Sequence, residues 1–137
     1  MAPTHDLGLL PEKPRKAYAA EALTQYGLVR LNSDGELEMC DTQGEEADGW
    51  VDRAYAADDL VTYYKAGRLA TVIGDKTSVV LGARLTPSAE GSPATPGRSE
   101  LAASGDYAIG QALETPSADG DVIAFEADFS AGRWAKA

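Results

Sequence analysis

The clearest alternation of apolar and polar positions in this chain lies in residues 104–128. Its first half places side chains at alternate positions, namely Tyr107, Ile109, Gln111 and Leu113. A break at 116–120 (PSADG) separates it from a second run that puts three apolar side chains on one face, Ile123, Phe125 and Ala127. A period of two, bounded by Gly, Pro and Asp, is typical of half-buried antiparallel strands. This stretch therefore predicts a strand, a turn and a returning strand.

Two earlier hairpins are predicted from the same kind of pattern. Residues 27–31 and 36–40 flank an Asn-Ser-Asp-Gly turn, which supplies the positive φ angles that a tight hairpin needs. Residues 59–65 and 68–73 flank Ala66-Gly67, which we interpret as the turn of a second hairpin.

The remaining strands are expected at 50–55, 79–81 and 83–86. Residues 87–98 are rich in Pro, Ser, Gly and Ala, a composition that favours an exposed loop or a hairpin tip.

The two ends of the chain lack the alternating pattern of the middle. Residues 1–15 contain three prolines around Leu7, Leu9 and Leu10, so we expect an extended N-terminal arm that docks on its own domain or on a neighbour. Residues 16–26 could be a short helix by propensity or an entry strand. The expected organisation is an arm (1–15), a β domain (16–128) and a C-terminal tail (129–137) that carries Trp134.

A faint internal duplication links the two halves. Residues 50–54 parallel 108–112, and residues 56–63 parallel 118–125; both units read as strand, acidic turn, strand. Chance similarity between acidic turns is the alternative. Two similar units that close on each other would remove exposed sheet edges. The predicted fold class is all-β, a small β-barrel or β-sandwich of antiparallel hairpins with two pseudo-repeated halves.

Charge and composition narrow the range of functions. The 137 residues carry a formal net charge of -10, which disfavours binding to a nucleic-acid backbone. Cys40 is the single cysteine, so an internal disulfide is impossible. No apolar run reaches the roughly 18 residues of a membrane span, and the N-terminal residues lack the order of a signal peptide. We therefore expect a soluble protein, made in the cytoplasm, that contacts neither nucleic acid nor membrane.

No catalytic set can be assembled from the sequence. His5 is the single histidine and lies in the arm, so no base is available for a Ser or Cys nucleophile, and zinc sites built on Cys and His are excluded by count. Acidic loops at 45–48, 58–59 and 119–121 lack the spacing of a calcium loop. We expect no catalytic residue, no cofactor and no metal site. An acidic small-barrel enzyme or ligand-binding module is the competing class.

The second half resembles the small β-barrel head decoration, or capsid cement, proteins of tailed viruses. The resemblance rests on GARLTPSAEG (82–91) and on GDYAIGQALETPSADGDVIAFEA (105–127), and it extends over roughly residues 27–128. Its motif positions are Ile109, Gly110, Ala112, Leu113, Glu114, Ala118, Gly120, Asp121, Val122 and Ile123. The proline-rich arm and residues 92–97 depart from the family pattern.

This resemblance implies a virion structural protein without enzymatic activity. Such proteins bind the outer surface of the shell of major capsid protein and stabilise it, often as homotrimers, so the implied partners are the major capsid protein and further copies of this chain. Other virion parts of similar fold, such as a turret or a fibre base, are the alternative. We expect Leu7, Leu9, Leu10 and Trp134 to contact the partner, the opposite possibility being that they fold back on their own barrel.

Overall fold

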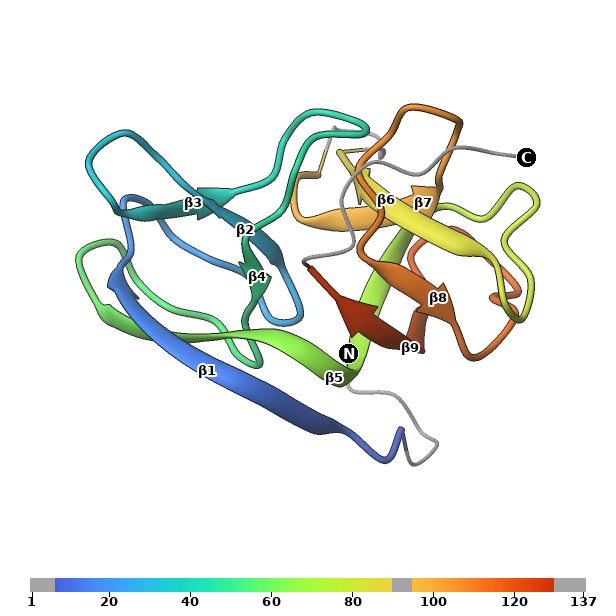
Figure 1. Ribbon diagram of the computed structural model, residues 1–137, viewed down its shortest axis with the longest axis horizontal. Helices are drawn as coiled ribbons and strands as arrows, with labels where there is room; N and C mark the ends of the chain where they lie inside the picture. Colours follow the sequence, from blue (N-terminus) through green and yellow to red (C-terminus); the bar gives the residue numbers. More distant parts are fainter. Residues whose placement is uncertain (1–6, 90–94, 130–137) are drawn as a thin grey trace.

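The computed structural model describes residues 7–89 and 95–129, and within them the chain is built of β-strands without a helix. The order along the chain is β1 (Leu10–Tyr18), β2 (Leu28–Leu31), β3 (Leu37–Met39), β4 (Gly49–Trp50), β5 (Leu60–Asp75), β6 (Arg84–Ser88), β7 (Arg98–Leu101), β8 (Gly110–Ala112) and β9 (Val122–Asp128) (Figure 1). The predicted all-β class is confirmed. The helix considered for 16–26 does not form, because residues 16–18 complete β1.

The second half of the chain closes into a five-stranded barrel. Around this ring the order is β5-β7-β6-β8-β9, and seven residue pairs between β9 and β5 close it. The predicted pairing of 104–128 is confirmed, since β8 and β9 are antiparallel neighbours. The three side chains predicted to share one face of β9, Ile123, Phe125 and Ala127, are all buried in the core.

The first half forms a smaller ring that shares β5 with this barrel. Its strands β3, β2, β4 and β5 are neighbours in that order, and β1 pairs with β5 from Leu10↔Arg68 to Tyr18↔Leu60. One isolated parallel bridge closes the ring, between Ala19, the residue that follows β1, and Leu37 of β3. In Figure 1, β5 runs from the first ring into the second, with β1 beside its first part and β9 beside its second part.

The pairings of the two rings repeat each other, as the sequence duplication predicted. The pairs β2–β3, β2–β4 and β4–β5 recur as β6–β7, β6–β8 and β8–β9. The parallel bridge Ala19↔Leu37 likewise recurs as Ile73↔Ser99 between β5 and β7. The second part of β5 therefore plays in the second ring the role that β1 plays in the first.

The register confirms one half of the predicted alignment and corrects the other. Tyr18 pairs with Leu60 as Val72 pairs with Val122, so 56–63 and 118–125 correspond as predicted. Trp50, however, corresponds to Gln111 rather than to Ala108, because these two residues hold equivalent positions opposite the later strand.

The hairpin predicted around Ala66-Gly67 is wrong. β5 continues through both residues for 16 residues, and Gly67 lies opposite Pro11 of β1. Gly67 has φ +115, and a side chain there would collide with the backbone carbonyl of Leu10. The glycine thus allows two backbones to approach closely within a continuous pair, which is a recognised use of strand glycines.

Two further strand predictions are corrected. Residues 79–81 form a turn, in which Val79 is buried while Val80 and Leu81 are exposed. Of the strand predicted over 50–55, only Trp50 belongs to β4, and Tyr55 makes an isolated bridge with Leu23. The loop predicted over 87–98 is shorter than expected, since β6 and β7 extend into it from both sides as an antiparallel hairpin.

Trp50 joins the two rings. Its side chain is fully buried in the larger core cluster, among side chains of the second ring such as Leu69 and Phe125. Its indole Nε1 donates a hydrogen bond to the carbonyl oxygen of Ala70 (2.6 Å), and its ring stacks on Tyr26 with centroids 5.9 Å apart. The equivalent Gln111 is exposed, because no segment among residues 7–89 and 95–129 buries it as the second ring buries Trp50.

Candidate interaction surface

The described residues contain no cluster of potential metal ligands. Within 7–89 and 95–129, no three His, Cys, Asp or Glu side chains converge to hold a metal ion. Cys40 is buried and free, and burial raises the pKa of its thiol. No helix in this part of the chain is long and apolar enough to cross a membrane. His5, the single histidine, lies outside the described residues.

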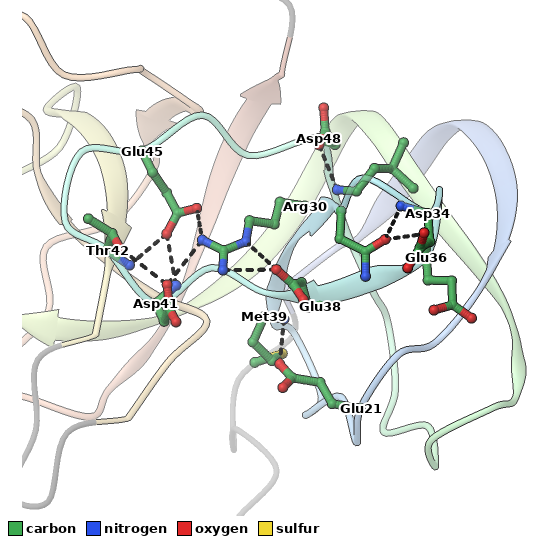
Figure 2. A network of polar contacts seen from close by, with 12 residues as sticks. Glu21, Arg30, Asp34, Glu36, Glu38, Met39, Asp41, Thr42, Glu45 and Asp48 are labelled. Carbon is green, nitrogen blue, oxygen red and sulfur yellow. Dashed lines mark hydrogen bonds and ion pairs between the residues drawn. The ribbon is translucent and has the colours of Figure 1, made fainter.

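The densest polar network surrounds Arg30 on β2 (Figure 2). Its guanidinium contacts Glu38 of β3 at 2.9 Å and, in the loop that follows, Asp41 at 3.0 Å and Glu45 at 2.5 Å. The other carboxylate oxygen of Glu45 accepts hydrogen bonds from the backbone amides of Asp41 and Thr42. One cation therefore ties the β2–β3 hairpin to the loop at 41–45.

The Arg30 network stabilises the fold and does not provide an acid or a base. The pKa of Arg30 is raised above its ordinary value, chiefly by the hydrogen bond to Glu45, and the bond to Glu38 adds to the effect. A guanidinium whose pKa lies so far above neutral pH keeps its proton and cannot act as an acid or a base. Three carboxylates around one cation also leave this corner of the surface negative.

Negative charge is concentrated in the first ring. Eleven of the 22 acidic residues lie within residues 20–59, where Arg30 and Arg53 are the only bases. β1 has the opposite sign, with Lys13, Arg15 and Lys16 all exposed on one strand. Among the described residues, none of these three side chains forms an ion pair. The first ring is thus acidic over its hairpins and basic along β1.

The structure separates the residues that were expected to contact a partner. Leu7 is buried, packs with Ala70 and Ala124, and so folds back on its own chain. Leu9 is partly buried against the same cluster, whereas Leu10 is 68% exposed at the start of β1. Trp134 lies outside the described residues. The boundary expected between residues 15 and 16 falls inside β1.

Sequence reasoning missed other exposed apolar side chains. Tyr18 and Leu60 are 56% and 52% exposed and face each other across the β1–β5 pair. Val80 and Leu81, in the turn before β6, are 53% and 67% exposed. Neither pair stands out in the sequence. Tyr18 and Leu60 become one patch only through the antiparallel register of two strands more than 40 residues apart.

The comparisons with known proteins concern the fold. No protein-family model matches the chain, and no curated protein sequence matches it. Among solved structures, the chain is similar to the head fiber gp8.5 N base of bacteriophage phi29, with a TM-score of 0.63 and 15% sequence identity. This alignment covers 90% of the present chain and 98% of that one. At this identity the likeness shows a shared fold, and the two folds correspond over nearly their whole lengths.

Proposed function

We propose that this protein is a structural component of a tailed-phage virion, attached to the outer surface of the capsid head. The observation that carries the proposal is the similarity over nearly the whole length to a phage head fibre base, since a chance likeness to one hairpin or one barrel would cover less of either chain. The resemblance of residues 82–127 to head decoration proteins points independently to the same location.

The internal architecture is also suited to a structural role. Two rings share one long strand and bury Trp50 at their junction, so they pack as one unit. The largest polar network fixes a hairpin to a loop through Arg30, whose guanidinium keeps its proton because its pKa is raised. Together these features support a protein that binds other proteins rather than one that transforms a substrate.

Within this role, two forms are distinguished by what binding does to the shell. A cement protein bridges neighbouring capsid subunits and so stabilises the shell by mass action. A fibre base needs only a firm attachment at a limited set of positions. The structural similarity favours the fibre base, whereas the sequence resemblance favours cement.

The test is binding of the purified protein to empty shells of the major capsid protein from the same virus. We expect co-sedimentation that saturates at a fixed number of copies per shell. For a cement protein the shell unfolds at a higher temperature once saturated, whereas for a fibre base its unfolding temperature is unchanged. Absence of saturable binding at both low and moderate salt would contradict the proposed attachment.

A further inference from the structure

Opposite charges are gathered on two different sides of the first ring. Residues 20–59 contain eleven acids and two bases, so this segment accounts for -9 of the net charge of -10. β1 has the opposite sign, because it carries three bases and one acid. In Figure 1, β1 lies along one side of the first ring and the β2–β3 hairpin along the other. The two sides therefore do not neutralise each other within one molecule.

The cations of β1 have no carboxylate partner among the described residues. Arg15 donates a hydrogen bond of 2.9 Å to the carbonyl oxygen of the neighbouring Pro14, and Lys16 Nζ lies 3.5 Å from the hydroxyl of Thr62. Both side chains are exposed, as is that of Lys13. Arg30, by contrast, is surrounded by three carboxylates of its own chain. The positive charge of β1 is therefore free to attract the carboxylates of another molecule.

Exposed apolar side chains lie beside one of these cations. Lys16 and Tyr18 are two residues apart in the regular part of the β1–β5 register, so they share one face of the strand. Leu60 lies opposite Tyr18, and the two are 52% and 56% exposed respectively. A tyrosine with an apolar neighbour and a cation is a common combination in protein interfaces. We call these three residues the cationic surface: Lys16, Tyr18 and Leu60.

The β2–β3 hairpin has the complementary character. Asp34 lies in its turn and Glu36 directly after the turn (Figure 2), and neither carboxylate forms an ion pair with a described residue. Arg30 does not neutralise them, because its guanidinium contacts Glu38 and the loop that follows. Leu31, the last residue of β2, is 38% exposed at the start of the same turn. We call these residues the anionic surface: Leu31, Asp34 and Glu36.

We propose that the cationic surface of one copy binds the anionic surface of the next copy, in a head-to-tail contact between copies of this chain. Each surface supplies what the other lacks, namely charge of the opposite sign next to an exposed apolar side chain. Because the two surfaces are different, a copy that uses one of them still offers the other to a further copy. Such heterologous contacts close into a ring where the rotation between copies permits it. The contact is therefore compatible with the homotrimer that the family resemblance implies.

The large net charge does not prevent this contact. Repulsion between whole molecules is screened over about 8 Å at physiological salt, whereas charges that meet across a contact lie closer than this. Complementary charges then fix which surfaces meet and in which orientation. Each surface is small compared with the interfaces of stable oligomers, so we expect a dissociation constant of roughly 10–1,000 µM for each contact.

The experiment is sedimentation equilibrium of the full chain over a range of concentrations. The average mass should rise beyond that of a dimer, and it should fall when the salt concentration is raised from about 0.05 M to about 0.5 M. Lys16→Glu and Asp34→Lys should each weaken association by about fivefold, because each places like charges across the contact. An equimolar mixture of these two variants should have a higher average mass than either variant alone, since each supplies the surface that the other has kept intact.

Matched controls make the same changes of charge on the second ring. Lys76→Glu and Glu126→Lys alter exposed side chains there and should leave association unchanged. For the apolar part, Tyr18→Ser and Leu31→Ser should each weaken association, whereas Val80→Ser, at a residue that is 53% exposed in the second ring, should not. Circular dichroism checks that every variant is folded.

Three results would overturn the proposal. They are a protein that stays monomeric at all concentrations, a dimer that grows no further, and a mixture of Lys16→Glu with Asp34→Lys that associates no better than its components. Equal effects of the control variants would overturn it as well, because the net charge alone would then explain the result. None of these measurements involves capsid shells, so this inference and the proposed function can fail separately.

Discussion

Replacing Gly67 tests whether β5 is one continuous strand held close to β1. The residue lies opposite Pro11, and an added Cβ would meet the carbonyl oxygen of Leu10 and lie 3.1 Å from the amide nitrogen of Glu12. These are backbone atoms, which cannot swing aside as the end of a long side chain can. Gly67→Ala should therefore push β1 away from β5 locally.

The loss of stability in Gly67→Ala is best compared with that in a second glycine variant, Gly35→Ala. Gly35, in the β2–β3 turn, also has a positive φ (+76), but an added Cβ there meets nothing within 4 Å. Gly35→Ala should cost about 1 kcal/mol for the left-handed backbone alone. At Gly67 a comparable backbone cost is joined by the collision, which adds about 2 kcal/mol. The predicted total for Gly67→Ala is about 3 kcal/mol.

Thermal unfolding followed by tryptophan fluorescence measures both variants against the original protein. For a domain of this size, the melting temperature should fall by about 10 °C for Gly67→Ala and about 4 °C for Gly35→Ala. Equal losses would refute the reasoning, because a glycine at the tip of a hairpin would face open space just as Gly35 does. The two variants therefore decide between the hairpin expected from the sequence and the continuous strand.

Three further predictions concern single side chains. Leu7→Ala should lower the free energy of unfolding by about 2 kcal/mol because Leu7 is buried, whereas Leu10→Ala should change it by less than about 0.5 kcal/mol, as urea titrations of both variants will check. Cys40 should react with a thiol reagent only in denaturant, because the native thiol is buried with a raised pKa; rapid labelling without denaturant would contradict this. Hydrogen bonds from the amide and hydroxyl of Ser117, the largest causes, lower the pKa of Asp121 below its ordinary value. Its stabilising effect is therefore present above the unfolded pKa of about 4 and is lost as the pH falls through the lower folded value. Asp121→Asn should be less stable at pH 7, with a difference that disappears in acid unfolding curves near pH 2; a constant difference would contradict the assignment.

Local turn chemistry explains which parts of the fold could be predicted from the sequence. The Asn-Ser-Asp-Gly turn is held by its own residues, since the side-chain oxygen of Asn32 accepts hydrogen bonds from the amides of Asp34 and Glu36. The turn at 116–120 is fixed in the same way by Asp121, which accepts from Ser117. Because these contacts span at most four residues, the sequence alone indicates both hairpins.

The errors occurred where a distant segment determines the local structure. Gly67 has the sequence context of a hairpin turn, but its φ and its crowding are set by β1, more than 50 residues earlier. The exposed pair of Tyr18 and Leu60 has the same origin, because it exists only through strand register. Leu7, one of the residues expected to contact a partner, packs instead on Ala70 and Ala124, which lie more than 60 residues later in its own chain.

The duplication shows why one half of the predicted alignment was right and the other was wrong. Residues 56–63 and 118–125 face the same surroundings in both rings: an acidic turn bonded to the preceding ring strand, then side chains that alternate into a barrel core. Similar surroundings select similar residues, and the match is visible in the sequence. Trp50 and Gln111 occupy equivalent backbone positions but opposite surroundings, since one is covered by the second ring and the other by solvent. A repeat that shares a strand must become asymmetric at its junction, so the residues that join the rings are those in which sequence similarity between the halves is lost.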